Sequence, residues 1–293
     1  MRTTAAGDST SVCAVVVTHN RRELLATCLD RLDAQTRPPD AILVVDNASS
    51  DGTAELLAGR DGIEIERLDE NGGGAGGFAR GLELAHRAGH EWIWLLDDDT
   101  FAEPDCLAAL LNGARRAPRP PSVVSSVARW RDGRLHPMNG PWLRNARGEF
   151  ARAARERLAA MRAATFVSTM IRRDAVDRHG LPPAHYFIWL DDIEYTARIL
   201  RCEAGYVVPD STALHWTPRP YNSVTDTRER FYFKVRNHLW LLRGRAFGGW
   251  ERVGYANSLL RAIATYLRSS PSRTRALAVV LRGIRDGLGP EPR

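Results

Sequence analysis

The chain has 293 residues, of which 44% are apolar and 26% charged, and it carries a formal net charge of +6. These proportions exclude a disordered or collagen-like chain, and no stretch approaches the ~18 consecutive apolar residues of a membrane-spanning helix. The length fits one large domain or a domain with a substantial extension, at roughly 100–200 residues per domain. Residues 1–11 are polar and lack the apolar core of a signal peptide, which predicts a cytoplasmic protein.

The cysteine and lysine contents add little about partners. Cys13, Cys28, Cys106 and Cys202 lie far apart and form no CxxC pair, as expected for reduced thiols in the cytosol. Lys234 is the only lysine among the 41 basic residues. Arginine binds phosphates and carboxylates well, but the codon usage of the source genome produces the same excess. Composition alone therefore selects no partner.

The first hundred residues alternate between short β-branched runs and amphipathic helical stretches, which is typical of a parallel sheet built from βαβ units. The predicted strands are 12–17, 42–45, 63–68 and 92–96. A first helix is predicted after Asn20, which is expected to cap it because Glu23 follows three residues later. A second helix begins near Thr53, and a Gly-rich turn, 71–77, opens a third that runs to about Ala88.

The remainder of the chain divides into an α/β part and a helical part. A helix from Pro104, a strand at 122–127, a strand at 166–171 and a helix from Asp174 continue the α/β pattern. A further helix, headed by two acids, is predicted to reach about residue 204, before a strand at 206–208. Residues 129–162 fit neither pattern and are expected to form a loop over the site. Arg-rich helical segments follow at 228–243, 255–267 and 276–288, so we expect an α/β domain over 1–220 and a helical region over 221–293.

Three consecutive acids, Asp97, Asp98 and Asp99, follow the apolar strand 92–96 directly. Adjacent carboxylates repel one another unless a cation or hydrogen-bond donors compensate their charge. Mg²⁺ typically binds one or two carboxylates together with phosphate oxygens, and ligands dock at the carboxyl ends of parallel strands. The triplet therefore predicts a divalent cation and a phosphate-bearing substrate. An exposed acidic turn that caps the next helix is the structural alternative.

A second acidic pair, Asp191 and Asp192, stands at the predicted start of a helix. The helix dipole stabilises acids at this place, which is a purely structural explanation. Two acids beside aromatic residues are also typical of a catalytic base in a partly apolar pocket. His215 is either a hydrogen-bonded core histidine or, with the acid triplet, the third ligand of a mixed nitrogen and oxygen site for Mn²⁺ or Mg²⁺.

The Gly-rich turn has two competing interpretations. Gly72, Gly74 and Gly77 match GxGxxG, and Asp97 follows about 20 residues later, as in a dinucleotide-binding fingerprint. This match supports an NAD(P)-dependent oxidoreductase as an alternative function. However, that fingerprint follows the first strand of its fold, whereas two βα units precede this turn. Glycines that let the backbone approach a nucleotide or sugar, or a tight entry into a helix, explain the turn equally well.

The ends of the first two strands, 17–21 and 44–53, place polar residues at the sheet edge where the acid triplet also emerges. Asp46 is suited to accept a hydrogen bond from a pyrimidine imide. Taken separately, each of the two segments is also typical of a surface loop without a function.

Six segments, in this order and spacing, together resemble family 2 inverting glycosyltransferases of the GT-A fold: VVVTHNR, VVDNASSDGT, NGGGAGGF, WLLDDD, WLDDIEY and LHW. The sequence is most similar to the bacterial galactofuranosyl- and rhamnosyltransferase branch, over roughly 12–216. The resemblance implies a Rossmann-like, mostly parallel central sheet flanked by helices, with a C-terminal helical extension. It also implies transfer of a sugar, with inversion, from a UDP-galactofuranose or dTDP-rhamnose type of donor to an acceptor hydroxyl.

The resemblance further implies a role for each residue that matches a family motif. The donor is expected to contact Thr18, Asn20, Arg21, Asp46, Asn47, Asn71, Gly76, Gly77, Asp97 and Asp98. The metal, Mn²⁺ or Mg²⁺, is expected on Asp97, Asp99 and His215. Asp192 corresponds to the general base, and Asp191 is the alternative because the extra leucine in WLDD leaves the alignment open. Trp189 and Glu194 are expected near the acceptor, which is a glycan, a glycolipid or a small natural product.

The Arg-rich C-terminal helices leave three interpretations open. A basic protein could bind nucleic acid through them, but the acid clusters count against this, and we expect no nucleic-acid partner. Apolar residues of 228–243 interleave with basic ones, as in an amphipathic helix at the inner membrane face. These residues are Phe231, Tyr232, Val235, Leu239, Trp240 and Leu242. The favoured interpretation is that the helices pack on the catalytic domain or pair between subunits of a homo-oligomer.

Overall fold

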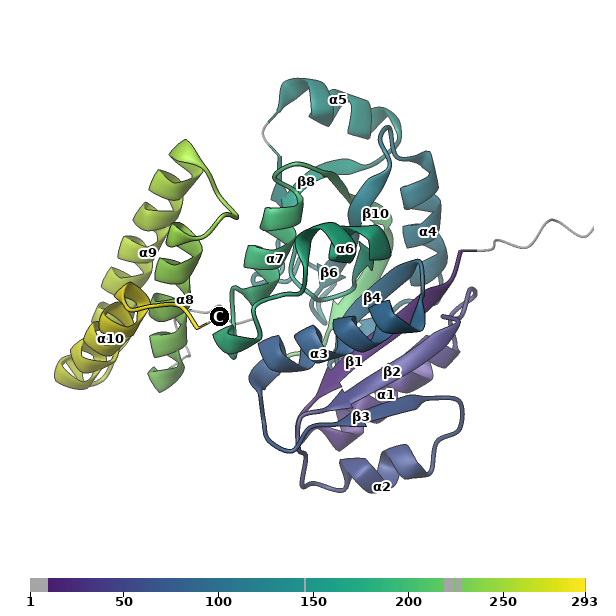
Figure 1. Ribbon diagram of the computed structural model, residues 1–293, viewed down its shortest axis with the longest axis horizontal. Coiled ribbons are helices and arrows are strands. Elements are labelled where there is room, and N and C mark those ends of the chain that lie inside the picture. Colours follow the sequence, from purple (N-terminus) through teal and green to yellow (C-terminus); the bar gives the residue numbers. More distant parts are fainter. Residues whose placement is uncertain (1–9, 145, 219–223, 225–227, 293) are drawn as a thin grey trace, which may run out of the picture.

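Figure 1 shows a computed structural model of the chain, which describes residues 10–144, 146–218, 224 and 228–292. Helices flank a central sheet, and three C-terminal helices form a group at one side of this α/β body. The expected α/β class with a helical C-terminal extension is confirmed. The domain boundary expected at residues 220–221 lies outside the described residues.

The central sheet is mixed. Its order is β3-β2-β1-β4-β9-β6-β10-β8-β7, and β5 pairs with β10 off this path. Strands β3, β2, β1 and β4 are parallel, as are β6 and β10, whereas β9 runs antiparallel between β4 and β6. The strands are β1 (Val12–Thr18), β2 (Ala41–Asp46), β3 (Glu64–Arg67), β4 (Trp92–Asp97), β5 (Thr100–Ala102), β6 (Pro121–Arg129), β7 (Trp142–Leu143), β8 (Ala159–Ala163), β9 (Thr169–Arg172) and β10 (Ala204–His215).

Helices cover both faces of the sheet because the central strands are apolar on both sides. Along β1, Val12, Ala14 and Val16 join one buried cluster, and the alternate residues join the other. The helices are α1 (Arg22–Asp33), α2 (Thr53–Ala58), α3 (Gly73–Ala88), α4 (Cys106–Arg116), α5 (Arg147–Arg155), α6 (Arg173–His179), α7 (Asp191–Ile199), α8 (Phe231–Arg243), α9 (Gly249–Ser269) and α10 (Arg273–Leu288). Two short 3-10 helices are η1 (Ala184–Tyr186) and η2 (Arg228–Arg230).

The start of α1 differs from the sequence-based prediction. The N-cap residue is Arg21, not Asn20, and the Arg21 side chain forms no capping hydrogen bond. Asn20 has a left-handed backbone with φ of 53°, and its Oδ1 accepts a hydrogen bond from the Ser50 amide. The capping-box prediction is therefore wrong, because Asn20 joins the loops after β1 and β2 instead of beginning the helix.

Two further segments differ from their predictions. Residues 129–162 do not form only a loop, because they contain β7, α5 and β8. Helix α7 ends at Ile199, and β10 begins two residues before the predicted strand and continues seven residues beyond it, to His215. A register shift between Val207 and Thr212 interrupts the pairing of β10 with β6, which explains why only the first half of β10 has an apolar strand pattern.

Three of the four cysteines are buried, and Cys202 is exposed. Burial raises the pKa of the Cys13 thiol to about 12 and also raises that of Cys28, so both stay protonated near neutral pH.

Helix α8 packs inward. Phe231 and Val235 are fully buried against α9 and α10, and Trp240 and Leu241 join a cluster with Tyr186 and other residues of the α/β body. The alternative interpretation, in which the apolar face of this segment lies on a membrane, is therefore wrong for its buried residues, and the favoured interpretation, packing on the catalytic domain, is confirmed for Trp240. Within the described ranges, no helix is both long and apolar enough to cross a bilayer.

Candidate active site

Three strand ends meet at one edge of the sheet. Thr18 at the end of β1 pairs with Asp46 at the end of β2, and Val17 pairs with Asp97 at the end of β4. Parallel pairing of β1 with both neighbours requires this convergence. The expectation that these polar residues share one edge is confirmed.

The acid triplet meets His215 at this edge. One ligand atom each from Asp97, Asp99 and His215 lie within 4.8 Å of one another. The imidazole arrives because β10 pairs antiparallel with β5, with His215 opposite Thr100. The Nε2 atom of His215 lies 3.2 Å from Oδ1 of Asp99.

The residues around this cluster fit a divalent cation. Nδ1 of His215 lies 2.7 Å from Oδ1 of Asn139, so Nδ1–H donates and Nε2 is directed at Asp99. Asn139 is itself held by Thr165, whose Oγ1 accepts from Nδ2 at 2.9 Å. Oδ1 of Asp99 is buried and faces Nε2 of His215, but it accepts no well-aligned hydrogen bond within the described part of the chain. Two carboxylates and an oriented imidazole suit Mn²⁺ or Mg²⁺.

Arg21 compensates the negative charge of the triplet. Its NH1 lies 3.1 Å from Oδ1 of Asp98 and 2.5 Å from Oδ2 of Asp99. Oγ1 of Thr18 donates to Asp98 at 2.8 Å. Burial, with the neighbouring acids, raises the pKa of Asp97 to about 6 and that of Asp98 to about 7. For Asp99, His215 and Arg21 outweigh burial and lower the pKa. Thr18 and Arg21 thus both bind Asp98, and the expected contacts of these three residues with a donor stay predictions.

The loop after β2 contains buried acceptors without donors. Oδ1 of Asp46 accepts from the Ser49 amide at 2.9 Å. Oδ2 of Asp46 and Oδ1 of Asn47 are buried without a hydrogen-bond partner among the described residues, although Oδ2 lies 3.8 Å from Nε of Arg67. An unsatisfied buried acceptor is costly, so both atoms are suited to a ligand that donates. His19, which the sequence analysis did not select, supports this loop through Nδ1, 2.7 Å from the Asn47 carbonyl.

Close packing explains two of the glycines in the Gly-rich turn. Gly73 has φ of +70°, and a Cβ atom there would lie 2.0 Å from the carbonyl oxygen of Phe187. A Cβ atom on Gly77 would lie 2.4 Å from Cγ1 of Val17, whereas one on Gly76 would meet nothing within 4 Å. Oδ1 of Asn71 accepts from the Gly73 amide at 2.8 Å. The turn follows β3, not the first strand, so its position contradicts the dinucleotide fingerprint.

The second acidic pair begins α7, directly after a loop of unusual backbone conformation. Phe187, Trp189 and Leu190 all have positive φ, between 66° and 71°. Asp191 is buried, and burial raises its pKa well above the usual range. Burial also raises the pKa of Asp192 to about 6, and the charge of Asp97 contributes to this shift. The fold therefore brings the two acidic clusters into one electrostatic neighbourhood.

The two expected acceptor residues have partners within the protein. Glu194 forms an ion pair with Arg198, with Oε1 2.8 Å from Nε. The Trp189 carbonyl accepts from Nδ2 of Asn237 at 2.9 Å, and its side chain packs against an apolar cluster. Contact of either residue with an acceptor stays a prediction.

Besides His19, sequence reasoning missed three residues that the fold brings to the site. Asn139 lies in the segment that matched no pattern, and Lys234 and Asn237 lie on α8. Burial lowers the pKa of Lys234 to about 8, while the charge of Asp192 opposes that shift. The one signal available was that Lys234 is the only lysine. A single sequence contains no motif or pattern that marks Asn139 or Asn237 as part of the site.

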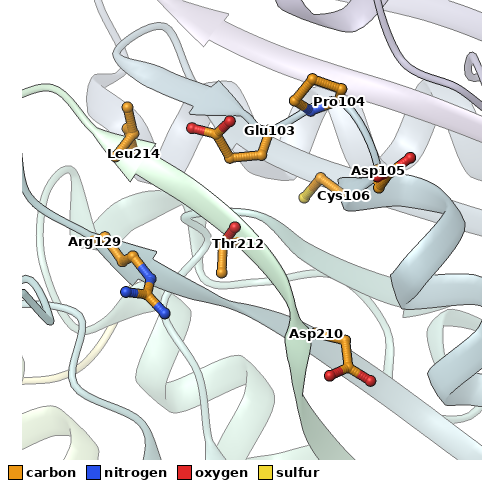
Figure 2. A pocket seen from close by; sticks show the side chains of 8 residues that line it. All are labelled: Glu103, Pro104, Asp105, Cys106, Arg129, Asp210, Thr212 and Leu214. Carbon is orange, nitrogen blue, oxygen red and sulfur yellow. The ribbon is translucent and has the colours of Figure 1, made fainter. Parts of the chain in front are cut away.

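A cavity of about 380 Å³ lies apart from these residues (Figure 2). Its lining consists of Glu103, Pro104, Asp105, Cys106, Arg129, Asp210, Thr212 and Leu214. Thr212 and Leu214 alternate with Ala213 and His215 along β10, so they point to the other face of that strand. The cavity is therefore not the site of the acid triplet.

Comparisons of sequence point to one family. The model described as "Glycosyl transferase family 2" matches residues 13–180. The galactofuranosyltransferase GlfT1 of Mycolicibacterium smegmatis is 34% identical over 252 residues, 79% of this chain and 82% of that protein. The N-acetylglucosaminyl-diphospho-decaprenol L-rhamnosyltransferase of Mycobacterium tuberculosis is 28% identical over 295 residues, 89% of this chain and 94% of that protein.

Comparisons of structure agree. S. aureus TarS in complex with UDP-GlcNAc has a TM-score of 0.60 at 15% identity, over 94% of this chain and 90% of that chain. The mannosyltransferase PcManGT from Pyrobaculum calidifontis, in complex with GDP-Man and Mn²⁺, has a TM-score of 0.57 at 19% identity, over 92% of this chain and 78% of that chain. At these identities the likeness concerns the fold, and it confirms the expected fold class.

Proposed function

Because the chain belongs to glycosyltransferase family 2 and is therefore an enzyme that transfers a sugar from a nucleotide-sugar donor, we propose a more specific reaction. The enzyme transfers galactofuranose from its UDP donor to an acceptor hydroxyl, with inversion at the anomeric carbon and dependence on a divalent metal. The 34% identity to a galactofuranosyltransferase favours this sugar over the rhamnose of a dTDP donor, which is the second candidate.

The observation that carries the proposal is the convergence of Asp97, Asp99 and His215 beside Asp192. The first three have ligand atoms within 4.8 Å of one another, and the charge of Asp97 acts on Asp192. A divalent cation bound by the three ligands supplies Lewis-acid stabilisation of the departing diphosphate. The solved mannosyltransferase with a similar fold contains Mn²⁺, which supports this metal.

Asp192 acts as the general base. The acceptor oxygen forms a bond to the anomeric carbon while the bond from that carbon to the diphosphate oxygen breaks, and the hydroxyl proton passes to the Asp192 carboxylate. Burial raises the pKa of Asp192 to about 6, so it is ionised at neutral pH and still basic enough to accept a proton. Asp191 has a higher pKa and is buried, which favours Asp192 as the base.

The loops after β1 and β2 bind the nucleotide. The unsatisfied Oδ2 of Asp46 is suited to accept from the imide N–H of a pyrimidine, and Asn20 ties the two loops together. Uracil and thymine share this imide, whereas N3 of cytosine carries no hydrogen, so Asp46 selects uracil or thymine without separating UDP from dTDP. The similar fold of TarS, solved with UDP-GlcNAc, supports a UDP donor.

The acceptor is a glycan or a glycolipid that the enzyme meets at an anionic membrane surface. One relative is named for a diphospho-decaprenol acceptor, which supports this class over a small natural product. Helices α9 and α10 carry exposed apolar side chains, including Trp250 and Leu281, together with exposed arginines. Apolar residues among arginines suit peripheral contact with anionic lipids.

A panel of nucleotide sugars tests the donor and the metal. We expect nucleotide release from UDP-galactofuranose in the presence of Mn²⁺ or Mg²⁺ and its loss with EDTA. Nucleotide release that is unaffected by EDTA would contradict the metal assignment. Faster turnover of dTDP-rhamnose would contradict the donor assignment. NADPH should neither bind nor be oxidised.

Substitution of the base tests the mechanism. We expect Asp192→Asn to abolish transfer while Mn²⁺-dependent UDP binding is kept, because the nucleotide site lies at the strand ends. Asp61→Asn, at an exposed acid, is the matched control. Normal turnover by the Asp192 variant would exclude this residue as the base.

A further inference from the structure

Helix α8 contacts the loop that leads into the catalytic acids. Asn237 of α8 is fully buried, although it carries a polar amide. Its Nδ2 lies within hydrogen-bond distance of the carbonyl oxygens of Tyr186 at 3.0 Å, Ile188 at 2.9 Å and Trp189 at 2.9 Å, so its two N–H groups are shared among three acceptors. A single side chain thus contacts the last residue of η1 and two residues of the loop that leads to α7.

The loop needs such support because of its backbone conformation. Phe187, Trp189 and Leu190 all have positive φ, which bulky residues rarely adopt unless surrounding contacts impose it. Leu190 is the N-cap of α7, so the loop conformation sets where Asp191 and Asp192 begin.

Contacts from α3 and from other residues of α8 also hold this loop. The Phe187 carbonyl accepts from the Ala75 amide at 3.2 Å. The ring of Phe233 on α8 stacks on that of Phe187, with centroids 5.1 Å apart. NH2 of Arg236 donates to the His185 carbonyl at 3.1 Å. Helix α8 therefore contacts the loop through three side chains in five residues of sequence.

The same face of α8 carries a cation whose charge acts on the pKa of the proposed base. Lys234 stands three residues before Asn237, which places both on one side of the helix. Its charge interacts with that of Asp192. The helix that holds the loop thus also contributes a cation that acts electrostatically on the proposed base.

We propose that Asn237 is a positioning residue for catalysis, whose amide holds residues 186–189 in the conformation that presents Asp192 to the acceptor. Helix α8 is then part of the catalytic apparatus and not an accessory extension. The inference rests on the proposed role of Asp192 as the base.

The test compares Asn237→Ala with Asn257→Ala, a matched control at an exposed asparagine of α9. In the full-length Asn237 variant we expect kcat to fall by about 100-fold, as for a displaced catalytic group. The donor KM and Mn²⁺-dependent UDP binding should stay unchanged. Amide hydrogen exchange at residues 186–190 should become faster, and the Asn257 variant should match the wild type in every measurement.

A double variant separates positioning from a general loss of structure. If Asn237 acts through Asp192, adding Asn237→Ala to Asp192→Asn should lower the residual rate little further. An additive loss, an unchanged kcat, or unchanged exchange in the loop would each overturn the proposal. If Asn237→Ala does not fold, Arg236→Met removes the bonds of Arg236 to the His185 and Tyr186 carbonyls and to Oδ1 of Asn237, while the Asn237 amide stays in the protein. It should raise loop exchange and lower kcat several-fold without changing UDP binding, and wild-type values would overturn the proposal.

The two proposals fail in distinguishable ways. Normal turnover by Asp192→Asn would remove the base assignment. A low rate in that variant together with a normal rate in Asn237→Ala would remove only the positioning role.

Discussion

Two charged neighbours, Asp97 and Lys234, act on Asp192 in opposite directions. Burial is the main reason that the pKa of Asp192 is about 6; Asp97 adds to the rise and Lys234 opposes it. The proposed base must be ionised, so activity should fall as the pH drops below about 6. Asp97 and Asp98, with pKa values of about 6 and about 7, titrate in the same range, so a variant that changes the surroundings of Asp192 is needed to identify its part of the acid limb.

Substitution of Lys234 tests whether its charge lowers the pKa of Asp192. Lys234→Met removes a charge that lowers the pKa of Asp192, so the pKa should rise and the acid limb of kcat/KM should move to higher pH, by less than about 1 unit. Lys234→Arg keeps the charge and should keep the limb in place. A limb that does not move in Lys234→Met would mean that the lysine leaves the base unaffected.

Asn139 should tune the metal site without touching the metal. Its Oδ1 is 2.7 Å from Nδ1 of His215, so it fixes which imidazole nitrogen is directed at Asp99. Loss of a partner of this kind typically lowers metal affinity by about 10–100-fold. We expect that drop for Asn139→Ala in Mn²⁺ titrations of activity, with Asn112→Ala, at an exposed position, as control. Equal Mn²⁺ affinity in the two variants would argue against the site.

At the scale of elements, close contact between α3 and β1 depends on glycine. A Cβ atom on Gly77 would lie 2.4 Å from Val17, on a strand buried on both faces. Gly77→Ala should therefore lower the free energy of unfolding by about 1–3 kcal/mol, the usual cost of overpacking a core. Denaturant unfolding measures the change.

Gly76 provides the matched control within the same helix. A Cβ atom there meets nothing within 4 Å, so Gly76→Ala should leave stability unchanged or raise it by up to about 1 kcal/mol through helix propensity. If the expected donor contact of Gly76 holds, the same variant should raise the donor KM. An unchanged KM would exclude a close approach of the donor to this residue.

At the scale of the whole molecule, the C-terminal helices have two kinds of surface. Helix α8 is committed to contacts within the chain, whereas Trp250 on α9 is 88% exposed and Leu288 on α10 is 62% exposed. These outer residues, and not those of α8, are the ones available to a membrane.

Point variants test membrane contact better than a truncation, because removing residues beyond 220 would also remove Asn237 and Lys234. We expect the wild type to bind vesicles that contain anionic lipids, more weakly at high salt, and Trp250→Ser with Leu260→Ser to lower binding. Equal binding by the double variant would exclude this surface. A change from dimer to monomer in that variant would instead identify the surface as a contact between subunits.

The sequence predicted the elements whose pattern is local. The strands of the first hundred residues, the helix opened by the Gly-rich turn and the acid triplet at a strand end follow from side-chain periodicity within a few residues of each position. It failed where a local signal was misleading, as at Asn20. It also failed where the strand pattern was broken, as along β10, because register and not periodicity defines that strand.

By itself the sequence thus determined the α/β architecture, the family and the residue types that the chemistry requires. Only the tertiary structure decided that His215 lies against Asp99, that Asn139 orients it, and that α8 holds the loop before Asp192. These contacts depend on strand register and helix packing between segments far apart in the chain. No periodicity within one segment can encode the position of another, so their geometry is determined only when the whole chain has folded.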